Sequence, residues 1–213
     1  MRKAPCAGFS FILSVVFTTV LTSLFSQNLV PNPSFEEIDY CPNSSSELFY
    51  AVPWDTPSLA TPDLYNECAT HPAMGVPING LGYQAAHTGA GYAGALWRLY
   101  DTPGREYMGV PLLEPLVAGQ TYALSFWVSV ADEYCGVNQF GAYFSNAEPY
   151  FPTNDFLPLP AQVVVTNPNT NSEDWTLISD CFVAEGGEAW MIIGNFTPNA
   201  GSPFTPGCGL DIS

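Results

Sequence analysis

The segment from Thr121 to Val130 constrains the fold of this chain more than any other, because its side chains alternate strictly in character. Large apolar side chains stand at every second position: Tyr122, Leu124, Phe126, Val128 and Val130. The positions between them hold Ala123, Ser125, Trp127 and Ser129. A period of two is that of a β-strand with one face in a core. No window of eleven residues shows a convincing helical period, so we expect an all-β chain.

Strand signals recur from residue 91 onward, separated by Gly, Pro, Asn and Asp turns. They cover about 91–100, 105–112, 120–131, 138–145, 161–166, 174–184 and 187–196. Residues 28–36 are predicted to form an edge strand interrupted by prolines, and residues 41–81 a long loop region. The 20 prolines and 18 glycines suit many short strands and tight turns. We therefore predict a single β-sandwich domain of the jelly-roll type.

The N-terminus has the pattern of a secretory signal peptide. Arg2 and Lys3 precede an uncharged, mostly apolar run from Phe9 to Phe25, and Ser26 supplies a small residue at its exit. We predict a signal peptide over residues 1–26 and a mature module over 27–213, secreted or held on the outer cell surface. An uncleaved membrane anchor is the alternative, although the run is short for a membrane span.

The charge balance excludes two classes of partner. The chain has 20 acidic and 4 basic residues, and a net charge of −16. Removal of Arg2 and Lys3 with the signal would leave −18, with Arg98 and Arg105 as the only bases. Such a polyanion cannot neutralise phosphates, so we expect no nucleic-acid binding and no adhesion to anionic lipids. No second apolar stretch approaches membrane-spanning length, so no lipid insertion is expected after signal cleavage.

The cysteines agree with export. Cys6 would leave with the signal, and five cysteines would remain: Cys41, Cys68, Cys135, Cys181 and Cys208. In an oxidising compartment we expect two disulfides and one unpaired cysteine. Cys41 with Cys68 is the best local pair, and Cys135 with Cys181 is the second prediction.

No catalytic pattern stands out. Gly89 to Gly94 formally matches a dinucleotide-binding glycine motif, but its flanks are loop and strand, so we interpret it as a turn into a strand. The two histidines, His71 and His87, lie in loop-like segments without a nucleophile elbow, and we expect both to be exposed. Adjacent acids on a strand point to opposite faces and make no glycosidase pair. We therefore predict a protein that is not an enzyme.

Aromatic residues interleaved with polar ones carry the remaining signal. Sugar rings stack on Trp and Tyr, while their hydroxyls bond to amide and charged side chains. The predicted ligand-binding residues are Trp54, Tyr65, Asn79, Gln84, Trp97, Arg98 and Arg105. For each group of residues a structural role is the alternative to ligand binding. Half or more of the aromatic residues would suit the core, and both arginines would suit ion pairs with acidic residues of the protein.

A family resemblance becomes visible at this point. The opening segment Asn28-Leu29-Val30-Pro31-Asn32-Pro33-Ser34-Phe35-Glu36 resembles the first strand of the carbohydrate-binding modules of families 4 and 9. Further motifs follow in Pro62–Cys68, Val76–Gly80, Tyr92–Gly94, Arg105–Tyr107, Pro115–Tyr122 and Gly186–Phe196. Together they are similar to the N-terminal module of large cell-surface proteins of gliding-type Gram-negative bacteria. The resemblance implies a galactose-binding-like jelly roll over nearly the whole mature chain.

The resemblance also implies a structural calcium ion, with Glu36 as one ligand. Its usual partner is an aspartate in a last strand, and this chain stops at Ser213, just before that strand should begin. We therefore expect a C-terminally incomplete module, from a fragment or a truncated gene product. A stop codon directly after Ser213 with a cooperatively folding monomer would contradict this.

These observations favour a non-catalytic module that binds a polysaccharide or cell-surface glycan by aromatic stacking and polar contacts. The alternative is a structural or adhesion domain of a cell-surface protein with no sugar site. Burial of all three of Trp54, Trp97 and Trp127 would remove the physical basis of the first hypothesis.

Overall fold

The alternating segment forms strand β6 (Thr121–Val128) in the computed structural model, which describes residues 27–98, 104–132, 134–167 and 171–199. β6 pairs antiparallel with β9 (Thr176–Val183) over its whole length, from Thr121 opposite Val183 to Val128 opposite Thr176. Leu124 and Val128 are each 9 % exposed, whereas Trp127 between them is 44 % exposed. The predicted alternation is confirmed.

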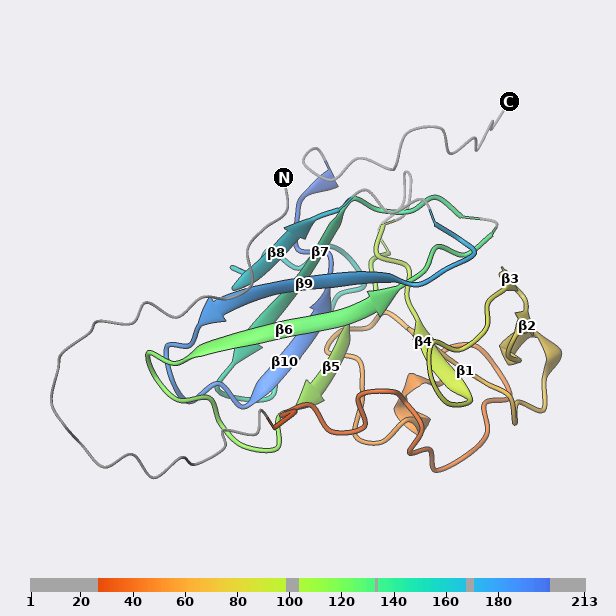
Figure 1. Ribbon diagram of the computed structural model, residues 1–213, viewed down its shortest axis with the longest axis horizontal. Coiled ribbons are helices and arrows are strands. Elements are labelled where there is room, and N and C mark those ends of the chain that lie inside the picture. The colour runs from red at the N-terminus through yellow and green to blue at the C-terminus, as the bar shows by residue number, and fades with distance from the viewer. Residues whose placement is uncertain (1–26, 99–103, 133, 168–170, 200–213) are drawn as a thin grey trace, which may run out of the picture.

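A second, four-stranded antiparallel sheet lies behind this pair (Figure 1). Its order is β5 (Met108–Pro111), β10 (Trp190–Gly194), β7 (Gln139–Ser145) and β8 (Val163–Thr166). β10 pairs with β5 on one side and with β7 on the other, and β8 completes the sheet beside β7. In Figure 1, β6 and β9 cross in front of this sheet, so the strands form two layers.

The core fills the space between the layers. It joins Leu124 and Phe182 of the β6–β9 pair to buried side chains of every strand behind them, among them Val110, Ala142, Phe144, Val163 and Met191. Phe144 and Phe182 stack across the layers with ring centroids 4.3 Å apart. Burial of apolar area contributes roughly 25 cal/mol per Å², so this contact between layers stabilises the fold. The predicted all-β sandwich is confirmed, while its jelly-roll topology stays a prediction.

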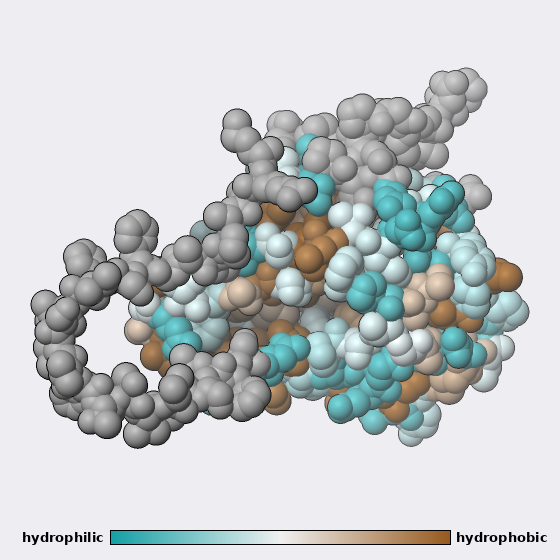
Figure 2. Space-filling model, in the orientation of Figure 1, coloured by the Kyte–Doolittle hydropathy of each residue, from teal (hydrophilic) through white to brown (hydrophobic). Residues whose placement is uncertain are grey.

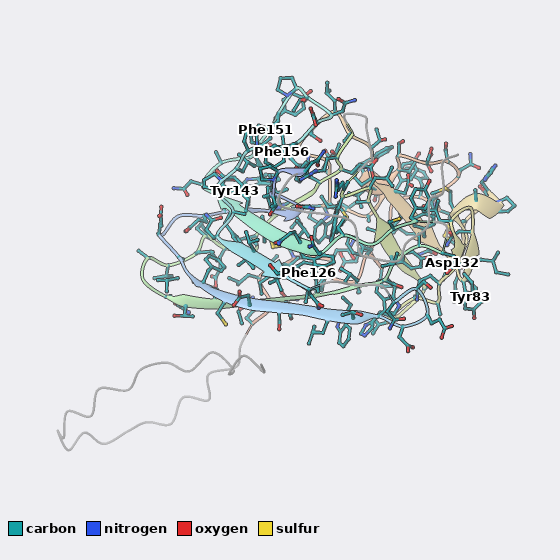
Figure 3. All side chains as sticks on the ribbon, turned by 90° about the horizontal axis from the view of Figure 1, so that it is seen from above. Tyr83, Phe126, Asp132, Tyr143, Phe151 and Phe156 are labelled. Atoms are coloured by element: carbon teal, nitrogen blue, oxygen red, sulfur yellow. A yellow bond between two sulfur atoms is a disulfide. The ribbon has the colours of Figure 1, made fainter. Side chains whose placement is uncertain are left out.

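The outer face of the four-stranded sheet is covered as well. Tyr107, Ile192 and Phe196 form a second buried cluster with Leu157, which lies in the loop between β7 and β8. In Figure 3, Tyr143, Phe151 and Phe156 gather on one side of the sheet, away from Phe126 on the other. Both faces of this sheet are therefore buried.

Short strands make up the other end of the molecule. β1 (Asp63–Asn66) pairs with β4 (Gly91–Gly94), and β2 (Ile78–Asn79) pairs with β3 (Gly82–Tyr83). Two 3-10 turns, η1 (Leu48–Tyr50) and η2 (Pro72–Met74), complete the elements. Each of the seven strand segments predicted from residue 91 onward contains a strand, shorter than predicted. β4 also confirms the reading of Gly89 to Gly94 as a turn into a strand.

The predicted edge strand over residues 28–36 is wrong, because these residues form bends and turns. Asn32 and Phe35 have positive φ values of 42° and 60°, which no extended strand allows. The buried Asn32 amide holds the turn. Its Nδ2 donates to the carbonyls of Glu37 (2.8 Å) and Val52 (2.9 Å), and its Oδ1 accepts from the Glu37 amide (3.0 Å).

The predicted signal peptide, the C-terminal segment with Cys208 and the incomplete last strand lie outside the described residues. Within the part of the chain that the structure describes, no helix has the length and apolar character needed to cross a membrane. The predicted disulfide between Cys41 and Cys68 is present, with Cα atoms 5.6 Å apart. Cys135 and Cys181 are also disulfide-bonded, and a bond between these two stays a prediction.

Candidate functional site

A groove of about 320 Å³ opens beside β6, between this strand and the segment that follows β4. Six of the seven predicted ligand-binding residues line it: Trp54, Tyr65, Asn79, Gln84, Trp97 and Arg98. The lining also includes the buried Met108 and Met191, so the groove reaches the core of the sandwich. Figure 2 shows hydrophobic and hydrophilic residues interspersed over the face that β6 and β9 cross. A concave site with a few polar groups among apolar ones is the usual form of a small-ligand site.

Exposed aromatic rings stand along the groove. Trp127 points outward from β6 and is 44 % exposed, although the His87 ring stacks on it with centroids 4.2 Å apart. Trp175 meets His87 edge-on at 6.1 Å, and its Nε1 donates to the Ala85 carbonyl (2.9 Å). Tyr83 (61 % exposed) and Tyr134 (42 % exposed) line the same groove. Because Trp127 is exposed, the hypothesis of sugar stacking keeps its physical basis.

Sequence reasoning missed part of this aromatic group. His87 is exposed, as predicted, but its stacking on Trp127 was not foreseen, and Trp175 was not singled out. His87 lies in a loop, Trp127 in β6 and Trp175 directly before β9. Because they are far apart in the sequence, no local spacing pattern predicts their contact. The only local signal was the outward position of Trp127 in the alternating strand.

The loop between β3 and β4 is fastened to the end of β6. The Ser129 hydroxyl donates to Gln84 Oε1, and the Tyr83 amide donates to Asp132 Oδ2 (2.9 Å). Figure 3 shows Tyr83 and Asp132 next to each other. Gly82 makes this approach possible, since it has a φ of 127° and a Cβ there would lie 2.2 Å from Asp132 Oδ2. Gln84 therefore positions the loop in addition to lining the groove.

A stack of two tyrosines forms a rigid inner wall. The Tyr65 and Tyr92 rings lie 5.2 Å apart and nearly parallel, on the paired strands β1 and β4. Asn79 Nδ2 donates to the Tyr92 hydroxyl (2.7 Å), while Asn79 Oδ1 accepts from the Leu81 amide (2.8 Å). Burial raises the pKa of Tyr92 to about 12, so both phenols are neutral at physiological pH. Tyr65 is only 3 % exposed and serves as support more than as a contact surface.

Two carboxylates line the inner part of the groove, and both are held by internal donors. Asp63 accepts from the Ser46 amide (2.6 Å) and the Tyr65 hydroxyl (3.1 Å). Glu106 accepts from the amides of Leu96 (2.7 Å) and Thr61 (3.3 Å). Burial raises the pKa of each acid, and these hydrogen bonds offset the rise in part. Their oxygens stabilise loops of the protein itself, which suits a structural role.

The two remaining predicted tryptophans differ in burial. Trp54 is 3 % exposed, packs against Phe35 and donates from Nε1 to the Asn32 carbonyl (2.9 Å), so it belongs to the core. Trp97 is half-buried and meets Phe140 edge-on at 5.3 Å. Its buried Nε1 has no hydrogen-bond partner among the described residues. Arg98 is half-buried beside it.

Arg105, the seventh predicted ligand-binding residue, is not part of the groove. It is 3 % exposed, and its Nη1 donates to the carbonyls of Asn195 and Thr197, both at 2.7 Å. Its guanidinium also lies 5.0 Å from the Phe156 ring centroid. The structure thus gives Arg105 a structural role, binding the chain after β10 to the covering loop.

Glu36, the predicted calcium ligand, holds a glycine turn. Its carboxylate accepts hydrogen bonds from the amides of Ala90 (3.0 Å) and Gly91 (3.1 Å). The described residues contain no group of three or more acids, histidines or cysteines arranged to hold a metal ion. Calcium at Glu36 stays a prediction, which a melting curve with Ca²⁺ and with chelator would test.

Comparison of this chain with protein-family models, with curated proteins and with solved structures gives no match. The resemblance to carbohydrate-binding modules of families 4 and 9 therefore stays a prediction from the sequence.

Proposed function

We propose that residues 27–213 form an exported, non-catalytic module that binds a polysaccharide or cell-surface glycan in the groove beside β6. The observation that carries the proposal is the groove itself, where the exposed rings of Tyr83, Trp127 and Tyr134 supply a contact surface beside six of the predicted ligand-binding residues. The groove volume of about 320 Å³ falls at the lower end of the range for ligand sites, about 300–1,000 Å³. Aromatic rings offer the flat faces on which sugar C–H groups stack.

The polar groups of the groove support binding more than catalysis. A general acid or base needs an oxygen that reaches the substrate. The oxygens of Asp63 and Glu106 instead receive hydrogen bonds from internal amides and from Tyr65. Among the described residues of the groove this leaves Asp132 as one exposed carboxylate, whereas glycoside hydrolysis needs a facing pair. Export by a signal peptide over residues 1–26 is part of the proposal and rests on the sequence alone.

Affinity electrophoresis through a panel of soluble polysaccharides tests the proposal. We expect at least one polysaccharide to retard the wild type, and Trp127→Ala to abolish most of the retardation, because an aromatic stacking contact contributes about 1 kcal/mol or more. Trp127 is the suitable target, since Trp54 is in the core and its loss would unfold the protein. Tyr150→Ala is the matched control, because Tyr150 is 63 % exposed and outside the groove.

A folded wild type that no polysaccharide retards would contradict the proposal. The alternative, a structural or adhesion domain without a sugar site, would then take its place. Equal loss of retardation in Trp127→Ala and Tyr150→Ala would show that binding does not use the groove.

A further inference from the structure

The groove carries an excess of negative charge. Among the residues that the structure describes, three carboxylates line it, those of Asp63, Glu106 and Asp132, against one guanidinium, that of Arg98. Asp63 and Glu106 are turned to internal donors, whereas Asp132 is exposed at the end of β6. The Tyr83 amide occupies Asp132 Oδ2, which leaves Oδ1 without a hydrogen-bond partner among the described residues.

Exposed aromatic rings line the groove together with this carboxylate. Tyr83 precedes the loop that is fastened to Asp132, and its side chain is 61 % exposed. Trp127 and Tyr134 flank Asp132 in the sequence, and they are 44 % and 42 % exposed. Electron-rich ring faces attract cations, and a nearby carboxylate adds a direct Coulomb attraction. Aromatic rings combined with one acid form a typical site for an ammonium group.

The charge of the whole molecule acts in the same direction. The predicted mature chain carries −18, so its field concentrates cationic ligands at the surface and repels anionic ones. A glycan built of uronic acids would meet this repulsion and the groove carboxylates together. A neutral glycan would gain nothing from the charge of Asp132 beyond an ordinary hydrogen bond.

We propose that Asp132, with Tyr83, Trp127 and Tyr134, forms a subsite for a protonated amine. This inference rests on the proposed function and narrows its ligand class to glycans that carry free amino groups. The ammonium group hydrogen-bonds to Asp132 Oδ1, and the sugar ring lies against the exposed aromatic rings.

Two hexasaccharides with the same backbone test the subsite in the folded protein of residues 27–213. One is the glucosamine hexamer, and the other is its fully N-acetylated, uncharged counterpart. Titration calorimetry at a pH of about 5 keeps most of the amines protonated, although the oxygens of an amino sugar lower its amine pKa below that of lysine, and it leaves an ordinary aspartate ionised. We expect the wild type to bind the amino form about tenfold more tightly, which corresponds to about 1.4 kcal/mol.

Asp132→Asn removes the charge but keeps an oxygen that accepts from the Tyr83 amide. This variant is expected to lower the preference for the amino form to about threefold or less, with unchanged affinity for the acetylated form. Glu114→Gln is the matched control, since Glu114 is exposed and outside the groove. It removes the same charge from the molecule and should leave the preference intact.

Several outcomes would overturn the subsite. One is equal affinity of the wild type for the two hexamers, and another is binding of neither hexamer. A third is an equal loss of preference in Asp132→Asn and Glu114→Gln, which would show that the preference arises from the net charge of the molecule. In each case a neutral polysaccharide that still retards the protein would leave the proposed function standing. The proposed function fails separately, when no polysaccharide of any charge retards the wild type.

Discussion

The buried side chain of Asn32 holds a turn in the segment where a strand was predicted. Its amide makes three hydrogen bonds to the backbone of the N-terminal segment and of the turn before Trp54, and its own carbonyl accepts from the Trp54 indole. Asn32 itself is 6 % exposed, and loss of its amide would remove the hydrogen-bond partner of part-buried backbone groups of Glu37 and Val52.

Asn32→Ala is therefore expected to lower the free energy of unfolding by about 2–4 kcal/mol, since it removes three part-buried hydrogen bonds and places alanine at a positive φ. Urea unfolding followed by tryptophan fluorescence measures this difference. Asn43→Ala is the control, because Asn43 makes an exposed side-chain contact to Thr70 and should cost under about 0.5 kcal/mol. Equal losses in the two variants would show that the Asn32 network carries no special weight.

The buried carboxylate of Asp63 predicts a definite dependence of stability on pH. Burial raises its pKa in the folded state above the ordinary value. The folded state therefore takes up the proton first as the pH falls, and the contribution of Asp63 to stability increases between its folded and unfolded pKa values. Above the folded pKa the buried charge opposes folding.

Asp63→Asn cannot ionise, so its free energy of unfolding should rise less than that of the wild type when the pH is lowered from about 7 to about 4, the ordinary pKa of an unfolded carboxyl group. Urea titrations at the two pH values give both slopes. The slope is not expected to vanish, because burial also raises the pKa of Glu106. An unchanged slope in Asp63→Asn would refute the role given to this acid.

At the scale of elements, a disulfide adds a covalent constraint to the segment around η1 and β1. Cys41 and Cys68 are 27 positions apart and close a loop that contains η1 and β1. A cross-link stabilises mainly by restricting the unfolded chain, by about 3–4 kcal/mol for a loop of this length.

The double variant Cys41→Ser/Cys68→Ser should therefore unfold with a free energy lower by about 3 kcal/mol. Both residues are exposed, so serine is tolerated at each position and the loss reports on the cross-link. Chemical unfolding of the oxidised wild type and the double variant gives the comparison. A difference below about 1 kcal/mol would show that the loop is already ordered in the unfolded chain.

The elements that could be predicted from the sequence are those whose signal is local. β6 to β10 carry apolar alternation or β-branched runs bounded by turn residues, so their existence was predicted, whereas their order in the sheets was not. Residues 28–36 failed because the positive φ of Asn32 depends on Val52 and Trp54, which lie about twenty positions away.

The site was foreseen in part for the same reason. Tyr65, Asn79 and Gln84 were recognised by residue type and do line the groove, whereas the meeting of His87, Trp127 and Trp175 is a product of tertiary packing. Arg105 is of a residue type that often contacts ligands. Only the structure shows that it is buried, with two backbone carbonyls and the Phe156 ring among its contacts.

At the scale of the whole molecule, the net charge acts against the fold. Like charges repel in the compact state, and the Debye length falls from about 30 Å to about 10 Å between 0.01 and 0.1 M salt. Because 20 acids face at most four bases, screening should stabilise the folded protein.

Raising NaCl from about 0.01 to about 0.2 M is expected to increase the melting temperature by roughly 2–4 °C, equivalent to about 1 kcal/mol for a domain of this size. Differential scanning fluorimetry provides the measurement. A charge-reduced variant with exposed acids replaced, Glu67→Gln, Glu114→Gln, Glu148→Gln and Glu173→Gln, should show a smaller increase. A melting temperature that falls with salt would show that attractive pairs outweigh the repulsion.

The strict alternation of β6 has a consequence for how the proposed binding surface could diversify. Leu124 and Val128 serve the interior, whereas Ser125 and Trp127 face the outside, so the two sets of positions are under separate selection. If this face binds a ligand as proposed, replacements at the outward set would alter which molecules it recognises without an obligatory loss of folding. This strand would therefore allow a library of outward substitutions to evolve new specificities on one unchanged interior.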